Sequence, residues 1–210
     1  MSGRNPHGGG GGRERGCMLV QRVFKRRGSL MAEKPVVCAL SGWSGSGKTT
    51  LACALVRYLE QHHHLRVAVI KHDGHPFPAD VSGSDTCRLA DAGALRTVLC
   101  GESGLVVRET DSASPQLETL IERFGCDVDV VLLEGFKQAD VDKIEVFRPS
   151  VGKEPLYAQP ERFSRIVAVA SDGPLPGTDC PLRLDLNRPE QIAEFILQYA
   201  MADFRVSACV

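Results

Sequence analysis

One short segment constrains the fold more than any other. Residues 42–49 read GWSGSGKT and match the pattern G-x-x-x-x-G-K-[ST]. The continuous apolar run over residues 36–40 precedes it and predicts a strand that is buried on both faces. Apolar side chains then recur at helical spacing from about residue 48 to residue 61. A strand, a glycine-rich turn and a helix in this order predict a phosphate-binding loop.

Each residue type in this loop has a chemical reason to be there. Glycine lets backbone N–H groups turn inward around a phosphate, and the N-terminus of the following helix adds unpaired N–H groups and a positive dipole end. The Lys48 side chain would reach the β- and γ-phosphates, and the Thr49 hydroxyl would join the shell of a Mg²⁺ ion. The expected nucleotide-binding residues here are Gly42, Ser44, Gly45, Ser46, Gly47, Lys48, Thr49 and Thr50.

A second candidate is the acid that ends the apolar segment 130–133. Glu134 follows four consecutive apolar residues, which is the Walker B pattern. Its carboxylate would lie across from Thr49 and hold the metal, directly or through water. Because Glu reaches further than the commoner Asp, Glu134 could instead orient the attacking water. We therefore expect Lys48 and Glu134 to be catalytic, and Thr49 and Glu134 to hold Mg²⁺.

Polar residues crowd together after the apolar strand predicted over residues 67–70. In an open α/β sheet, ligands bind beyond the carboxyl ends of the strands. Lys71 could pair with a phosphate, and Asp73 could bind Mg²⁺ or position water as a third catalytic residue. His72, His75 and Asp85 could contact the nucleotide or a second anionic ligand. The alternative is a solvated loop with its own turn chemistry.

The residue that reads the base is harder to predict, since no N-K-x-D guanine signature is present. Asp172 follows the apolar strand predicted over residues 166–170 and could accept hydrogen bonds from guanine N1 and N2. An aspartate before Gly173 and Pro174 could equally initiate a turn.

The remaining pattern alternates strands and helices. Further strands are expected near residues 97–100, 105–107, 128–133 and 143–146, and further helices over residues 84–93, over 117–124 and from about 189. Because Lys143 and Glu145 alternate with Ile144 and Val146, the strand near 143–146 is expected to have one wetter face. This order predicts an α/β fold of the P-loop NTPase class, a mostly parallel sheet with helices on both faces. The nucleotide-binding domain would span residues 35–203.

The formal net charge of −1 hides a basic tail and an acidic remainder. Residues 1–30 carry seven basic residues against the single acid Glu14. We expect residues 1–34 to be a disordered, basic, glycine-rich extension and residues 204–210 to be a C-terminal tail. A nucleic-acid-binding arm is the alternative for the N-terminal extension, but the acidic remainder argues against a general nucleic-acid surface. Without a membrane span, a signal peptide or a CxxC pair among its 8 cysteines, the chain is expected to be cytoplasmic.

A series of motifs in order carries a resemblance to one family. After the phosphate loop come K-H-D-G-H at 71–75, D-V-S-G-S-D-T at 80–86, A-G-A at 92–94, E-G-F-K at 134–137 and K-I-E-V-F-R at 143–148. Together they resemble MobB, the molybdopterin-guanine dinucleotide biosynthesis adaptor family, over about residues 35–200. One departure is Ser84, where the family more usually has Lys.

The resemblance implies a homodimer that binds GTP, hydrolyses it weakly and assists a MobA-type guanylyltransferase, which attaches GMP to molybdopterin. It places the family's phosphate-binding role on residues 45–50 and the Walker B role on Glu134. It also implies that the histidines and acids after residue 70 touch GTP or the pterin phosphate. The residues alone leave a small P-loop kinase open, with residues 149–165 as a lid carrying Lys153, Arg162 and Arg165.

Overall fold

The computed structural model describes residues 34–74, 81–109, 115–177 and 179–207, with side chains described as far as residue 200. The chain forms two compact units. The first comprises the described residues up to His72 and from Leu120 onward, and the second spans Asp73–Thr119. Most of the predicted 1–34 extension and His75 lie outside the described residues.

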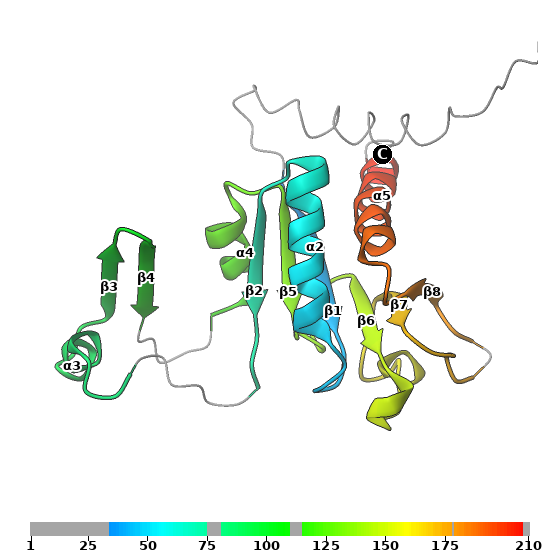
Figure 1. Ribbon diagram of the computed structural model, residues 1–210, viewed down its shortest axis with the longest axis horizontal. Coiled ribbons are helices and arrows are strands. Elements are labelled where there is room, and N and C mark those ends of the chain that lie inside the picture. Colours follow the sequence, from blue (N-terminus) through cyan, green and yellow to red (C-terminus); the bar gives the residue numbers. More distant parts are fainter. Residues whose placement is uncertain (1–33, 75–80, 110–114, 178, 208–210) are drawn as a thin grey trace, which may run out of the picture. The chain divides into compact units, whose positions relative to one another are not determined.

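The first unit is built on a six-stranded sheet in which every neighbouring pair of strands is parallel. The strand order is β2-β5-β1-β6-β7-β8 (Figure 1). The strands are β1 (Val36–Ser41), β2 (Val67–Lys71), β5 (Val130–Glu134), β6 (Lys143–Phe147), β7 (Ile166–Ser171) and β8 (Leu182–Asp185). β1 therefore lies between β5 and β6. The predicted α/β class with a mostly parallel sheet is confirmed.

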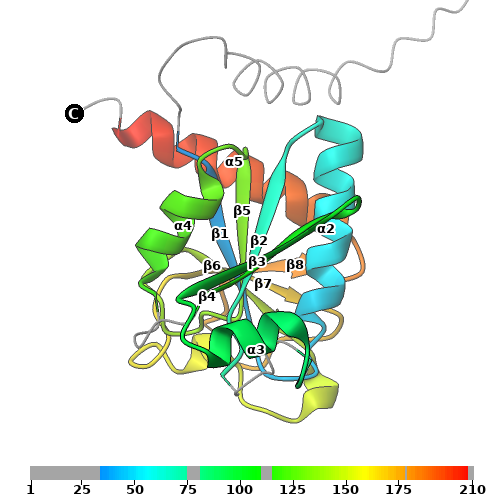
Figure 2. The same cartoon turned by 90° about the vertical axis from the view of Figure 1, so that its left-hand side faces the viewer.

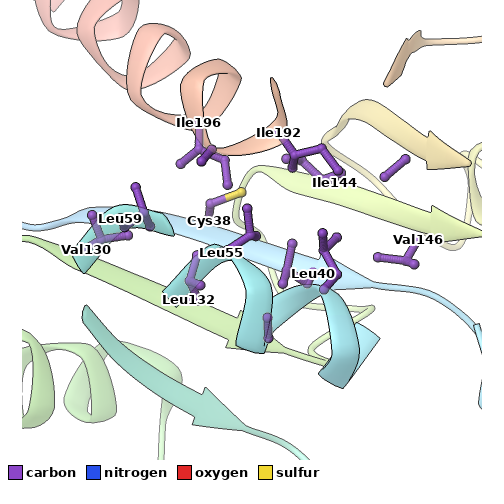
Figure 3. Close-up of a cluster of buried hydrophobic side chains, with 14 of the residues drawn as sticks. Cys38, Leu40, Leu55, Leu59, Val130, Leu132, Ile144, Val146, Ile192 and Ile196 are labelled. Atoms are coloured by element: carbon purple, nitrogen blue, oxygen red, sulfur yellow. The ribbon is translucent and has the colours of Figure 1, made fainter. Parts of the chain in front are cut away.

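Helices cover both faces of this sheet. Helices α2 (Lys48–His63) and α5 (Pro189–Ser207) lie on one face, and α4 (Leu117–Gly125) lies on the other (Figure 2). The close-up in Figure 3 shows Leu55 and Ile192 of the two helices meeting Leu40, Leu132 and Ile144 of the sheet. On the opposite face α4 ends so close to the sheet that a Cβ at Gly125 would lie 3.0 Å from Val131. Strands covered on both faces explain the continuous apolar runs of the sequence.

Two sequence expectations need correction within this unit. Strand β8 was not predicted, because it is four residues long, lies at the sheet edge and is mostly exposed. The wetter face expected for β6 was wrong, since all five of its residues are buried. The Lys143 Nζ donates to the backbone oxygens of Ala139, Val141 and Ser164, and the Glu145 carboxylate accepts the backbone N–H groups of Leu156 and Tyr157. Backbone groups of adjacent loops thus provide the hydrogen bonds that water would give these two side chains on an exposed face.

The second unit contains helix α3 (Asp85–Asp91) and a hairpin of β3 (Arg96–Gly101) and β4 (Gly104–Glu109). The hairpin is antiparallel and forms a sheet of its own rather than extending the parallel one. Ser84, the position that departs from the family, caps α3 by accepting the Cys87 backbone N–H at 3.2 Å. Within the described part of this unit, Thr97 alone is buried.

Helix α5 continues to Ser207, through the predicted start of the C-terminal tail at residue 204. The domain limits at 34/35 and 203/204 stay predictions. No helix in the described ranges is long and apolar enough to cross a membrane.

The buried carboxylate of β6 gives the first testable prediction. Replacing Glu145 by Ala leaves two buried N–H groups without acceptors, so the free energy of unfolding should fall by about 3 kcal/mol. Urea unfolding followed by far-UV circular dichroism measures this. Glu154→Ala, an exposed acid in the same loop, is the matched control and should stay within about 0.5 kcal/mol of the parent.

The same pair also predicts a pH dependence. Burial raises the pKa of Glu145, while the N–H groups of Leu156 and Tyr157 partly oppose the rise. When a group has a higher pKa in the folded protein than in the unfolded chain, it stabilises the fold fully at pH values below its unfolded-state pKa. This stabilisation is lost as the pH rises through its folded-state pKa. The stability gap between parent and Glu145→Ala should therefore narrow with rising pH. A gap that widens would contradict this assignment.

Candidate phosphate-binding site

The loop between β1 and α2 is pressed against the end of β6. Gly42 has φ +152°, and a Cβ there would lie 2.4 Å from the Val146 backbone oxygen. No side chain fits between the loop and the strand. Gly47, with φ +97°, makes the turn into α2 in the left-handed region that favours glycine. Both glycines of the motif's fixed positions are therefore required by local geometry.

The start of α2 carries no side-chain cap. Its N-cap residue is Gly47, and the first helical hydrogen bond runs from the Leu51 N–H to the Gly47 oxygen. The N–H groups of the first turn consequently have no acceptor within the helix. The Ser46 Oγ is also buried and has no hydrogen-bond partner among the described residues. Unpartnered donors at the positive end of a helix fit an anion such as a phosphate.

Lys48 lies over this loop. Its Nζ donates to the Trp43 backbone oxygen at 2.9 Å. Burial lowers the pKa of Lys48, the Glu134 charge opposes that shift, and the nearby Lys137 and Lys71 charges add to it. Trp43 is itself held, because its Nε1 donates to the Glu154 backbone oxygen at 2.7 Å and the Lys137 Nζ lies 4.5 Å from the centre of its ring. The Lys48 ammonium therefore lies beside two further cations.

The predicted pair of Thr49 and Glu134 is in contact. The Thr49 Oγ1 donates to Glu134 Oε1 at 2.7 Å, and the Lys71 Nζ lies 3.1 Å from the same oxygen. Only 7% of the Glu134 side chain is exposed, against 53% of Lys71. A hydroxyl and a carboxylate oxygen are donors that Mg²⁺ accepts, so these two residues fit the expected metal. In the stretches that the structure describes, no group of three or more His, Cys, Asp or Glu could hold a metal ion.

The backbone ties the ends of three strands together around Glu134. The N–H of Gly135 donates to the Leu40 oxygen, the Ser41 Oγ donates to the Gly135 oxygen, and the His72 N–H donates to the Glu134 oxygen. A Cβ at Gly135 would lie 2.7 Å from the His72 oxygen. The carboxylate of Glu134 is therefore fixed relative to the loop by β1 and β2 on either side of β5.

Sequence reasoning did not place Arg148 in the site. Arg148 follows β6, and its Nε donates to the Ser46 backbone oxygen at 3.1 Å. Its Nη1 lies 3.2 Å from the Asp172 carboxylate, just beyond β7. The available signal was an arginine directly after a buried strand. The sequence does not show which strand lies beside β1, so an arginine after β6 could not be assigned to the phosphate loop.

The structure brings some predicted residues together and leaves others apart. Lys48, Thr49, Lys71 and Glu134 form one cluster, and the His72 ring lies 5.2 Å from that of Phe136. Ser44, Gly45 and Thr50 are exposed in the loop and the first turn of α2. Asp172 faces Arg148. Asp73 and Asp85 belong to the second unit and His75 lies outside the described residues, so their roles stay predictions.

Comparison with known proteins places this site in a family. Residues 37–172 match the family model described as MobB, Molybdopterin guanine dinucleotide synthesis protein B. The molybdopterin-guanine dinucleotide biosynthesis adapter protein of Haemophilus influenzae is 39% identical over 158 residues, covering 75% of this chain and 85% of that protein. The adapter protein of Escherichia coli is 34% identical over 174 residues, covering 80% and 97%.

Solved structures agree with the sequence matches. A structure of molybdopterin-guanine biosynthesis protein B has a TM-score of 0.60 at 29% identity and covers 78% of this chain and 97% of its own. A MobB homolog from Bacillus stearothermophilus has a TM-score of 0.56 at 23% identity and covers 81% and 98%. The family model matches more than half of the chain, and both relatives exceed 30% identity over most of their length. The chain therefore belongs to the MobB family.

Proposed function

We propose that this protein is a GTP-binding adaptor with weak GTPase activity in molybdopterin-guanine dinucleotide biosynthesis, where it assists a MobA-type guanylyltransferase. The observation that carries the nucleotide part is the contact of Thr49 with Glu134 beside Lys48, at the uncapped start of α2. The pathway is supported by the names of the relatives.

The nucleotide's triphosphate would bind to the N–H groups of residues 45–50 and to the Lys48 ammonium. Lys48 would exchange its hydrogen bond to the Trp43 oxygen for phosphate oxygens, which are stronger acceptors because they are charged. Thr49 and Glu134 would hold Mg²⁺, which would neutralise charge on the phosphates. Gly42, Ser44 and Ser46 shape the loop that surrounds them.

Hydrolysis would be slow for a physical reason. Glu134 is the one buried acid that the described residues bring to the phosphate loop, and its Oε1 already contacts Thr49 and Lys71. Because that oxygen already meets two donors, Glu134 would mainly orient the attacking water rather than take a proton from it. We keep Asp73 as a proposed second acid of the reaction.

Guanine as the base, and molybdopterin as the second ligand, rest on the family resemblance. His72, His75 and Asp85 would then face the pterin phosphate or GTP. The kinase alternative is not favoured. Residues 149–165 are anchored to the first unit, because Leu156 and Phe163 are buried and the Leu156 N–H donates to the Glu145 carboxylate. A lid needs freedom to open.

The proposed homodimer is supported by the second unit. Its hairpin pairs Val98 with Val107 on one face and Leu99 with Val106 on the other, and all four are exposed. Helix α3 has no buried residue. The described residues of this small unit bury only Thr97, which is too little to make the unit stable alone. Apolar side chains on both faces of one ribbon call for a covering partner. We propose that a second copy of the chain provides it.

We also propose a cytoplasmic location and no nucleic-acid partner. The six described cysteines form no disulfide, as in a reducing compartment.

Lys48→Ala tests the site. Because the Nζ is hydrogen-bonded to a backbone oxygen of the loop, the fold should survive while GTP affinity falls about 10- to 100-fold. Isothermal titration calorimetry with GTP and with ATP, each with Mg²⁺, measures this and the base preference together. Lys153→Ala removes an exposed lysine and should leave affinity unchanged. Equal GTP affinity in Lys48→Ala and the parent would overturn the phosphate-loop assignment.

Glu134→Gln tests the mechanism. The amide keeps the shape but loses the negative charge, so kcat for GTP hydrolysis should fall about 100-fold while the Kd changes less than about threefold. Phosphate release under saturating GTP gives kcat. Glu60→Gln, an exposed acid on α2, serves as the control. Unchanged hydrolysis in Glu134→Gln would remove this residue from the mechanism.

The pair Leu99→Asp and Val106→Asp tests the dimer. The two positions lie opposite each other on one face of the hairpin, so two carboxylates there should split the dimer into monomers. Multi-angle light scattering after gel filtration reports the mass. Glu102→Ala, in the hairpin turn, should remain dimeric. A monomeric parent, or a variant that stays dimeric, would disprove this surface.

A further inference from the structure

We propose that Arg148 is a positioning residue that braces the phosphate loop from its outer side, and that Asp172 acts on phosphate binding through Arg148 rather than by contacting the base. This inference rests on the proposed nucleotide site and adds two residues with a defined role in it. It also changes the role that the sequence suggested for Asp172.

The first step is the contact with the loop. The Arg148 Nε donates to the Ser46 backbone oxygen at 3.1 Å, and its guanidinium lies beside Gly47, where a Cβ would be 3.4 Å from the Nε. In an anion-binding loop the N–H groups converge on the ligand, so the carbonyl oxygens point away from it. A side chain bound to the Ser46 oxygen is therefore on the outside of the loop and not in the phosphate position.

The second step is the support behind Arg148. Its Nη1 pairs with the Asp172 Oδ2 at 3.2 Å, with 36% of the arginine side chain and 28% of the aspartate side chain exposed. The guanidinium is planar and rigid, so holding one nitrogen on Asp172 fixes the direction of the other. Asp172 thus sets the orientation in which Arg148 meets the loop.

The third step is that Asp172 is itself held. The Ser171 Oγ accepts the Gly173 N–H at 3.2 Å and lies 3.0 Å from the Gly173 oxygen, which fixes the turn. A Cβ at Gly173 would lie 2.8 Å from Pro149, the residue after Arg148. The segments after β6 and β7 therefore meet closely, and a chain of contacts runs from β7 through Asp172 and Arg148 to the phosphate loop.

This arrangement makes a prediction that a base-reading role does not. A ligand that carries phosphates but no base should feel the loss of Asp172. We would measure the binding of inorganic tripolyphosphate and of GTP, both with Mg²⁺, by calorimetry. The variants are Arg148→Met, Asp172→Asn and the double variant, with Arg57→Met on the exposed side of α2 as the control.

Arg148→Met should weaken both ligands about tenfold, because a charge-assisted hydrogen bond to the loop is lost. Asp172→Asn should weaken both about threefold. The double variant should be no weaker than Arg148→Met alone, since Asp172 has nothing left to act through. Thermal unfolding identifies any variant that fails to fold. Arg148→Lys then replaces Arg148→Met, because lysine keeps the charge but cannot hold both partners.

The outcomes distinguish a failure of the nucleotide site from a failure of the bracing role of Arg148. A parent that binds neither ligand disproves the nucleotide site itself. A parent that binds, with both variants unchanged, disproves the bracing role alone. If Asp172→Asn weakens GTP but not tripolyphosphate, Asp172 contacts the base directly. If its effect adds fully to that of Arg148→Met, Asp172 acts independently of Arg148. If Asp172→Asn tightens binding, Arg148 is a phosphate ligand that Asp172 holds back. Each of these last results overturns the inference.

Discussion

The order of the parallel strands is the constraint on which the rest of this site depends. Because β1 lies between β5 and β6, the loop that leaves β1 has a neighbouring strand end on each side. On one side Glu134 reaches Thr49 at 2.7 Å. On the other side the Val146 oxygen leaves no space for a side chain at Gly42, and Arg148 holds the Ser46 oxygen. The loop is thus shaped from two strands, neither of which belongs to the motif that identifies it.

The electrostatics follow from the same placement. Lys48, Lys71 and Lys137 surround one buried acid, Glu134, so the site carries an excess of positive charge in a chain whose net charge is −1. Lysines in such proximity destabilise one another, as the lowered pKa of Lys48 reports, although burial is its largest cause. A bound anion would relieve that repulsion. The local excess of positive charge therefore favours a negatively charged ligand.

Contacts between residues of recognised motifs could be predicted from the sequence, whereas contacts that depend on the strand order could not. Thr49 and Glu134 were predictable as partners, because a phosphate loop and an acid after an apolar strand fix each other's positions. Arg148 and Asp172 were not, because their contact depends on β6 and β7 being neighbours. Lys143 and Glu145 misled the strand prediction for a different reason. Alternating charges usually face water, but here the backbone groups of adjacent loops satisfy both side chains.

The second unit buries far less of its apolar surface than the first. The first unit buries its apolar residues in one core, whereas the described part of the second buries Thr97 alone. Hydrophobic burial is the main favourable contribution to folding, so the described residues of the second unit gain little stability from burial among themselves. The hairpin of this unit exposes apolar side chains on both of its faces, which is the surface on which we base the proposed dimer. The contacts among Lys48, Thr49, Lys71 and Glu134 lie within the first unit, whereas the exposed apolar hairpin lies in the second.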